Sequence, residues 1–266
     1  MSISTTLIDR AEIRFQEAAN ALRPYVGCFW VLTAECGATI RVVPDGTAAI
    51  SIERQQSGYS EWFLRGPLLR PAERQFTAPT TLIGVRLRPG VAFMLSGIAA
   101  DSIVNRRIGL SRCPAFRELV SIDLSECTSE QCIDALQRFL INRLENSSVH
   151  YAVATALAEI DGEHGCQRVV DLAARCGVSA RHLNRLMRQW IGYGTKRYAG
   201  IVRFQATLMQ MERAHEQSVA VLASGSGYFD QAHLTVAMGR LAGATPGHLI
   251  SQGMSDFSKT RCDDLL

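Results

Sequence analysis

Four polar side chains between residues 181 and 188 have the types and spacing that DNA recognition requires. Arg181, Asn184, Arg185 and Arg188 stand at i, i+3, i+4 and i+7, so in an α-helix they share one face. An Arg guanidinium can bridge O6 and N7 of guanine, and an Asn amide can bridge N6 and N7 of adenine. The pattern therefore predicts a helix whose polar face contacts base edges in a major groove.

The elements around this helix are those of a helix-turn-helix. Ser179 is a good N-cap residue, a glycine-containing turn at 176–178 precedes it, and a short helix is predicted over 169–175. The face opposite the polar side chains is an apolar stripe, composed of Leu183, Leu186, Met187 and Trp190. A helix, a tight turn and a second capped helix form the motif in which the second helix enters the major groove.

The same pattern occurs a second time further along the chain. Residues 179–192 match residues 230–243 at a constant offset of 51. Asp230 is the second N-cap, after a turn at 227–229 and a predicted helix over 219–224. The apolar stripe is repeated as Leu234, Ala237, Met238 and Leu241. The C-terminal half therefore contains two helix-turn-helix units.

Charge is concentrated on the first of these units. The net charge of the 266 residues is only +3, but residues 166–213 hold nine basic and two acidic side chains. Lys196 and Arg203 belong to this basic segment and are candidate DNA contacts. From residue 214 to the end, three basic residues stand against five acidic ones. We expect the first unit to supply most of the attraction for phosphate.

The N-terminal half has the pattern of a β-rich domain. Strands are predicted over 26–34, 38–43, 47–53 and 81–88, with turn residues between them. Helices are predicted over 8–22, 91–98 and 129–144. One face of the last helix is apolar and would cover the barrel or pair with a second subunit in a homodimer; it comprises Cys132, Ile133, Leu136, Phe139 and Leu140.

The predicted fold class is α+β, with a barrel-like β domain before an all-α domain. We place the β-rich sensor or dimerisation domain at 1–125 and a connecting helix and linker at 126–148. The double helix-turn-helix domain follows at 149–252, and a loosely ordered tail at 253–266.

The β-rich half also contains candidate residues for an effector pocket: Trp30, Arg41, Trp62, Arg86 and Arg88. Arg86 and Arg88 alternate on one strand and so share a face, which is either solvent or an anion-binding cavity. The alternative is structural, with both Trp side chains in the barrel core or rim and the two Arg side chains paired with Asp45 or Glu53.

Motifs for catalysis, metal binding and membrane insertion are missing from the sequence. It has no G-x-S-x-G nucleophile elbow and no phosphate-binding loop. All six His residues follow residue 149, which disfavours a metal site in the barrel, and no two of the eight Cys residues form C-x-x-C. We therefore expect no enzyme activity, metal or cofactor. Without an export signal or a long apolar run, we expect a cytoplasmic protein with no membrane contact.

The C-terminal half resembles the AraC/XylS family of bacterial transcription regulators. The resemblance spans about 168–249 and rests on four segments: VVDLAARCGVSARHLNRLMRQWIG, KRYAGIVRFQATL, GYFDQAHL and RLAGATPGHL. It implies two helix-turn-helix units joined by a long helix, here about 196–215, that bind adjacent major-groove segments of double-stranded DNA. It also implies an effector or dimerisation domain, and RNA polymerase as a partner if the protein is an activator. The segments LRPYVGCFWVL, VVPDGTAAI, LRGPLL and GVRLRPGVAFMLSGI resemble a cupin-like barrel sensor of that family.

The resemblance places base-facing residues on both recognition helices. In the first they are Arg181, Asn184 and Arg185, and in the second Gln231, Ala232, Thr235 and Val236. Family members usually carry a basic residue where this chain has Val236, and often another at Gly239. We therefore expect the first unit to dominate recognition. The alternative is a degenerate partner protein that has lost DNA binding and acts through protein contacts.

Overall fold

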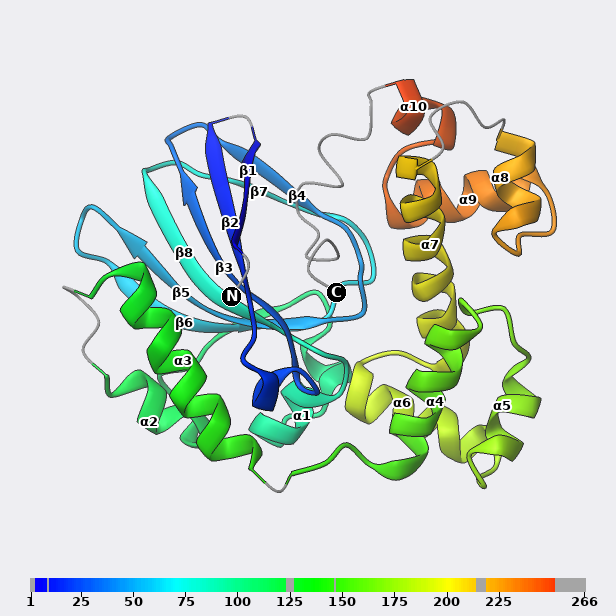
Figure 1. Cartoon of the computed structure of the whole chain (residues 1–266), viewed down its shortest axis with the longest axis horizontal. Coiled ribbons are helices and arrows are strands. Elements are labelled where there is room, and N and C mark those ends of the chain that lie inside the picture. Colours follow the sequence, from blue (N-terminus) through cyan, green and yellow to red (C-terminus); the bar gives the residue numbers. More distant parts are fainter. Residues whose placement is uncertain (1–2, 9, 123–126, 146, 214–218, 252–266) are drawn as a thin grey trace.

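The chain folds into a β-rich N-terminal lobe and a helical C-terminal lobe, which lie side by side in Figure 1. A computed structural model describes residues 3–8, 10–122, 127–145, 147–213 and 219–251. The α+β class expected from the sequence is confirmed. None of the helices in these ranges is long and apolar enough to cross a membrane.

The N-terminal lobe is built on a seven-stranded antiparallel sheet in the order β1-β2-β3-β8-β5-β6-β9. A two-stranded sheet, β4-β7, forms separately. No pairing between the outer strands β1 and β9 closes the larger sheet within the described ranges. The strands are β1 (Ile3–Ile8), β2 (Ala11–Glu17), β3 (Val26–Ala34), β4 (Thr39–Val42), β5 (Ala48–Gln55), β6 (Ser60–Arg65), β7 (Ala72–Gln75), β8 (Thr80–Leu87) and β9 (Arg107–Gly109).

The central strand β8 carries the sheet because it pairs with both β3 and β5. Its sequence TTLIGVRL is rich in β-branched residues and is buried at six of its eight positions, as expected for a strand covered on both faces. Gly84 is required here, since a Cβ atom at that position would lie 2.5 Å from the Trp30 ring and 2.7 Å from the Ile50 carbonyl.

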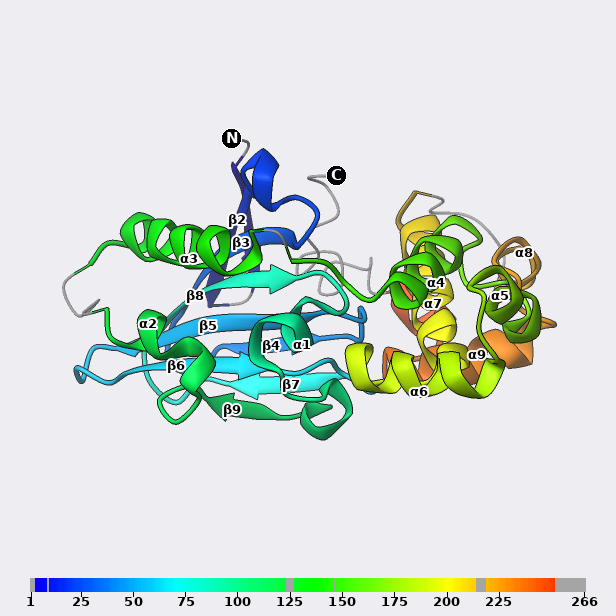
Figure 2. The same ribbon diagram turned by 90° about the horizontal axis from the view of Figure 1, so that it is seen from below.

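The longest of the helices that cover the outer face of this sheet lies across it in Figure 2. It is α3 (Ser129–Leu144), with the bounds expected from the sequence, and a capping box between Thr128 and Gln131 starts it. Its whole apolar stripe is buried against the sheet and the neighbouring helices α1 (Val91–Ser96) and α2 (Arg117–Val120). The stripe is therefore used within the chain, which removes the observation on which the homodimer hypothesis rested.

One prediction for the N-terminal lobe is wrong, and several of its strands were not predicted. The helix expected over 8–22 is wrong: the segment forms β1, β2 and a short 3₁₀ turn at 20–22. Ala11, Ile13 and Phe15 are buried at every second position of β2, and this period of two was mistaken for a helical stripe. The strands β6, β7 and β9 were not predicted.

The C-terminal lobe is all-helical and has one continuous apolar core. Residues from 252 onward, which include the expected tail, lie outside the described residues. The helices are α4 (Tyr151–Gly162), α5 (Val169–Arg175), α6 (Ala180–Ile191), α7 (Thr195–Arg213), α8 (Val219–Gly225), α9 (Gln231–Leu241) and α10 (Pro246–Ser251).

Candidate nucleic-acid interface

Helices α5 and α6 form the first helix-turn-helix as the sequence predicts. The Val178 amide donates to the Ala173 carbonyl at 3.1 Å, which closes the turn after α5. The Ser179 side chain accepts a hydrogen bond from the His182 amide at 3.2 Å and caps α6. Gly192, with φ at 87°, ends the helix in the left-handed region that favours glycine. The buried Leu183 and Met187 then hold the opposite face outward.

The exposed face of α6 carries three arginines, Arg181, Arg185 and Arg188. No Asp or Glu among the described residues forms an ion pair with any of them. Arg185 Nη2 lies 3.4 Å from His182 Nδ1, on the same helix. Three positive charges on one side of a capped helix, without internal neutralisation, form a surface suited to phosphate and guanine.

Asn184 lies at the edge of this face and has a structural contact of its own. Its Oδ1 accepts a hydrogen bond from the Thr195 amide at 3.2 Å, in the first turn of α7. The side chain therefore fixes the angle between α6 and α7. Bidentate contact with adenine uses both the oxygen and the nitrogen of the amide. The oxygen has a second lone pair free for this contact, but the bond to Thr195 restricts the orientation of the side chain.

The two basic residues expected on α7 differ in their surroundings. Lys196 is exposed in the first turn of α7, beside the end of α6. Arg203 instead donates to the Gly165 carbonyl, and its guanidinium lies 5.6 Å from the centre of the Tyr228 ring. Because these contacts hold Arg203 inside the domain, we remove it from the candidate DNA-binding residues. A count of basic residues in the sequence could not show that the Lys196 side chain is exposed and that the Arg203 side chain turns into the domain.

The second unit, α8 and α9, repeats the first with apolar side chains in place of charged ones. Asp230 Oδ1 accepts from the His233 amide at 2.7 Å and caps α9. Gln231 is exposed in the first turn. Thr235 donates its hydroxyl to the Gln231 carbonyl at 2.8 Å. Val236 is 71% exposed.

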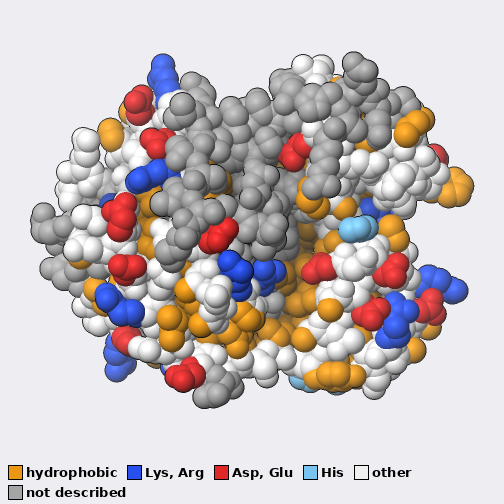
Figure 3. Space-filling model, in the orientation of Figure 1, with side chains coloured by type: hydrophobic (Ala, Val, Ile, Leu, Met, Phe, Trp, Pro, Cys, Tyr) orange, Lys and Arg blue, Asp and Glu red, His pale blue; other side chains and the backbone are white. Residues whose placement is uncertain are grey.

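The N-terminal lobe reaches the polar face of α6. Ala99 and Asp101, at the 3₁₀ turn η2 (Ala100–Ile103), line a groove of about 850 Å³ together with Arg181, Arg185 and Arg188. Figure 2 shows α1 beside α6. In Figure 3, hydrophobic side chains gather low in the middle of the molecule, where the lobes meet, with Lys and Arg side chains beside them.

Three further contacts join the lobes, two at or just after α6 and one on α7. The Phe93 and Trp190 rings meet edge to face, with centroids 4.8 Å apart. The buried Tyr193 hydroxyl donates to the Leu68 carbonyl at 2.6 Å, and burial raises the pKa of Tyr193. Gln205 donates to the Pro44 carbonyl at 2.6 Å. The recognition helix and the β-rich lobe are therefore physically connected.

A cavity of about 350 Å³ lies inside the N-terminal lobe, between the two sheets. Trp30 and Arg86, both expected from the sequence, line it, and Arg86 also pairs with Asp45 at 3.6 Å. The other three expected residues do not line this cavity. Trp62 is a core residue and only 5% exposed; Arg41 pairs with Glu73 across β4 and β7 at 3.4 Å. Arg88 follows β8 and donates to the Arg23 carbonyl at 2.8 Å. It does not line this cavity, but together with Arg86 it lines a second pocket of about 350 Å³.

Sequence reasoning missed four arginines of the cavity wall: Arg65, Arg74, Arg106 and Arg107. They lie on or beside β6, β7 and β9. Because these strands were not predicted, the sequence could not show which face of a sheet the four side chains are on. Burial lowers the pKa of Arg65, and none of the described carboxylates forms an ion pair with it.

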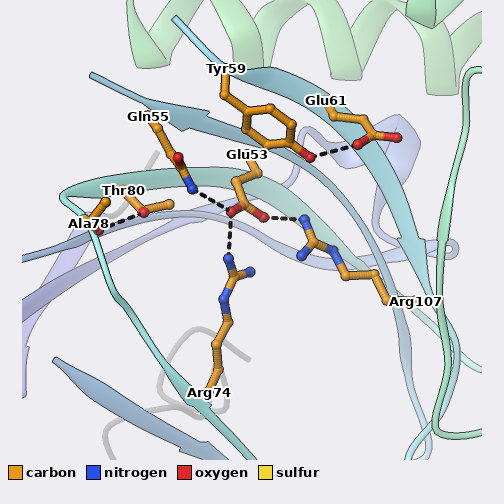
Figure 4. Close-up of polar contacts among 8 residues, drawn as sticks. All are labelled: Glu53, Gln55, Tyr59, Glu61, Arg74, Ala78, Thr80 and Arg107. Carbon is orange, nitrogen blue, oxygen red and sulfur yellow. Dashed lines mark hydrogen bonds and ion pairs between the residues drawn. The ribbon is translucent and has the colours of Figure 1, made fainter. Parts of the chain in front are cut away.

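Arg74 and Arg107 share one buried acid, Glu53 (Figure 4). Glu53 is 4% exposed. Its Oε1 accepts from Arg74 at 2.6 Å, and its Oε2 accepts from Arg107. Burial acts to raise the pKa of Glu53, but the two guanidinium groups outweigh it and lower the pKa. The cluster links β7 of the small sheet to β5 and β9 of the large one.

Comparisons with known proteins divide the chain in the same way. Residues 172–252 match a family model described as a helix-turn-helix domain, which confirms the resemblance seen in the sequence. Residues 15–109 match a domain of unknown function, DUF6597. No curated protein sequence matches the chain.

Solved structures similar to this chain include that of ToxT from Vibrio cholerae O395. That match has 10% identity and a TM-score of 0.41 and covers 83% of this chain and 95% of ToxT. Wild-type ToxT from Vibrio cholerae strain SCE256, bound to an unsaturated fatty acid, matches at 11% identity with a TM-score of 0.38. Here 83% of this chain and 93% of that chain are covered.

Proposed function

We propose that this chain, whose residues 172–252 form an AraC-type helix-turn-helix domain, is a transcription regulator that binds specific double-stranded DNA in the cytoplasm. It contacts the major groove mainly through α6. The observation that carries this proposal is the exposed face of α6, where Arg181, Arg185 and Arg188 have no ion pair to a described carboxylate. Lys196 extends the same positive surface onto α7.

The test is selection of bound sequences from a random duplex pool, followed by gel-shift titration of Arg185→Ala. Removing one bidentate guanine contact costs about 1–3 kcal/mol, or roughly 5- to 150-fold in affinity. Arg138→Ala is the matched control, because Arg138 is an exposed arginine on α3 of the other lobe. Equal losses for the two variants, or no enriched sequence, would contradict the proposal.

The second candidate function is that of a partner protein that binds no DNA. The apolar surface of α9 favours it, because Val236 is exposed where the first unit has Arg185. Such a protein would enrich no DNA sequence and would instead be retained by another protein. RNA polymerase is the expected protein partner only if the chain both binds DNA and activates transcription.

We further propose that the cavity of the N-terminal lobe receives a small effector with an apolar body and an anionic group. Its walls combine apolar side chains, among them Phe15, Trp30 and Leu32, with five arginines and one lining acid, Glu73. A volume of about 350 Å³ lies within the usual range of ligand pockets. An anion beside Arg65 would offset the cost of burying that guanidinium.

A short path connects this cavity to α6. Leu68 lines the cavity, and its carbonyl accepts the hydrogen bond from Tyr193, just after α6. Asn105 also lines the cavity and lies two residues after the end of η2, which contacts α6. A ligand that shifts either segment would therefore change the position of α6 relative to the N-terminal lobe. This coupling is the effector response that we propose.

A thermal-shift series tests the effector proposal. Carboxylates with aliphatic or aryl bodies are compared with the corresponding neutral amides, using the full chain and Arg65→Gln. We expect stabilisation by carboxylates alone, and its loss in Arg65→Gln. Equal responses to acids and amides, or an unchanged response in the variant, would refute an anionic effector at this site.

A further inference from the structure

The recognition helix of the second unit has an apolar ridge where the first has a polar one. At the offset of 51, Arg181 corresponds to Ala232, Asn184 to Thr235, Arg185 to Val236 and Arg188 to Gly239. Ala232, Val236 and Gly239 are exposed, and Thr235 is half-buried. We call these four residues of α9 the α9 ridge. Every position that carries a charge or an amide on α6 is small or apolar here, apart from one hydroxyl.

That hydroxyl is already used within α9. Thr235 Oγ1 donates to the Gln231 carbonyl one turn earlier, at 2.8 Å. A threonine in this arrangement presents its methyl group rather than its hydroxyl to an approaching surface. The α9 ridge therefore offers methyl groups and, at Gly239, open space, since a Cβ atom there would have no neighbour within 4 Å.

The turn before α9 adds an aromatic ring to the same end of the helix. Tyr228 bonds back to the Ala223 carbonyl as Val178 bonds back to that of Ala173, but one residue more separates Tyr228 from its N-cap. The additional residue is Phe229, which is 93% exposed. Phe229 adds to the exposed apolar residues of the α9 ridge, and exposed apolar residues that gather in one place mark an interaction site.

The position of α9 within the domain indicates DNA as that partner. α7 lies between the two units (Figure 1), and its 19 residues span about 28 Å at 1.5 Å per residue. This length is of the order of one turn of B-DNA, about 34 Å. The spacing of the two units therefore matches a duplex whose successive major-groove segments receive α6 and α9 in turn.

We infer that α9 recognises the C5-methyl groups of thymine. Apolar side chains distinguish thymine from other bases by contact with this methyl group, and Gln can bridge N6 and N7 of adenine. Gln231, exposed in the first turn of α9, is placed for the adenine of the same A·T pairs. The two units thus divide recognition: α6 contacts guanine and phosphate through charge, and α9 contacts A·T pairs through shape. This inference rests on the proposed DNA-binding function and specifies what the second unit binds.

The experiment uses the full chain and the duplex that it selects from a random pool. Thymidine is replaced by 2′-deoxyuridine, which keeps base pairing but lacks the methyl group, first in the half contacted by α9 and then in the other half. We expect a loss of about threefold to fivefold in affinity for each methyl group contacted, confined to the α9 half. Cross-linking through a modified base at each half assigns the two halves.

Variants of the α9 ridge distinguish a loss of methyl-group contact from a loss of folding. Val236→Ala and Val236→Arg should both lose the deoxyuridine effect, and Val236→Arg should steepen the salt dependence by about one charge. Val236 is exposed, so neither change should alter thermal stability. Val170→Ala is the matched control. Val170 is also an exposed valine, at 64% exposure, but it lies on α5 and outside the α9 ridge, so this variant should keep the deoxyuridine effect.

The outcomes of these experiments separate the thymine inference from the proposed DNA-binding function. Selected DNA that binds in a salt-dependent manner but shows no deoxyuridine effect, or the same effect in Val236→Arg, would overturn the thymine inference and leave the proposed function intact. A selected site with no base preference in the α9 half would do the same. Failure to select any DNA would overturn both, and would leave the exposed ridge as a surface for a protein.

Discussion

Among the described residues, Glu53 is the only carboxylate that pairs with Arg74 and Arg107, and substituting it by Gln removes this charge while keeping the shape of the side chain. Glu53 is 4% exposed, and each arginine side chain is 35% exposed. Breaking a fully buried pair costs about 3–5 kcal/mol. Because the arginines keep partial access to water, we expect about 2–3 kcal/mol, at the low end. For a chain of this size that corresponds to a fall of about 5–10 °C in Tm.

The pH dependence of this difference has a defined sign. The folded protein lowers the pKa of Glu53 below its ordinary 4.5, so its contribution to stability is complete above that value. It is lost as the pH falls through the lower folded pKa. The difference in Tm between the unsubstituted protein and Glu53→Gln should therefore be constant from pH 7 to about pH 5 and become smaller at lower pH.

Differential scanning calorimetry of the two proteins between pH 3 and 7 measures both effects. Glu61→Gln is the control, since Glu61 is more exposed than Glu53 and accepts its hydrogen bond from Tyr59, at 2.6 Å (Figure 4). We expect Glu61→Gln to change Tm by less than about a third of the change caused by Glu53→Gln. An unchanged Tm in Glu53→Gln at pH 7, or a gap that persists undiminished at pH 3, would refute the assignment of Glu53 as the link between the sheets.

Three further predictions concern the lobes and α6. Thr235→Ala should weaken binding of the selected DNA far less than Arg185→Ala, and equal losses in gel-shift titration would argue against dominance of the first unit. Asp101→Asn should strengthen DNA binding a few-fold, more at low salt, because Asp101 faces the arginines of α6 across the groove; anisotropy at two salt concentrations measures this, and weaker binding would count against it. Tyr193→Phe should lower stability by about 1–3 kcal/mol, because the Leu68 carbonyl loses its donor; denaturant unfolding reports the change, and a fully stable variant would exclude a connecting role for this bond.

The helical lobe was predictable because its signals are local. An N-cap, a glycine turn and an apolar stripe recur at a fixed offset, and α6 begins at the residue after the expected cap, Ser179. The orientation of individual side chains was less predictable. Arg203 belongs to the same basic segment as Arg185, yet it turns toward Gly165 and Tyr228, and only the packing of α7 decides that.

The β-rich lobe was harder to predict because its pairings are distant in sequence. The strong strands β3 and β8 were found from their β-branched residues, but β7 is a four-residue strand with the polar sequence AERQ. Its place is fixed by pairing with β4 and by the bond from Arg74 to Glu53, 21 residues away. The cavity residues Arg65 and Arg107 depend on such pairings, so sequence patterns identified Trp30 and Arg86 alone.

The salt dependence of binding to the selected duplex tests the central claim most directly. Three arginines on α6 and Lys196 would release about four counterions, which predicts a roughly hundredfold fall in affinity between 50 and 200 mM salt. Arg185→Ala should reduce the slope of log affinity against log salt by about one. Binding that is indifferent to salt, or absent even at 50 mM, would contradict the assignment of α6 as a DNA recognition helix.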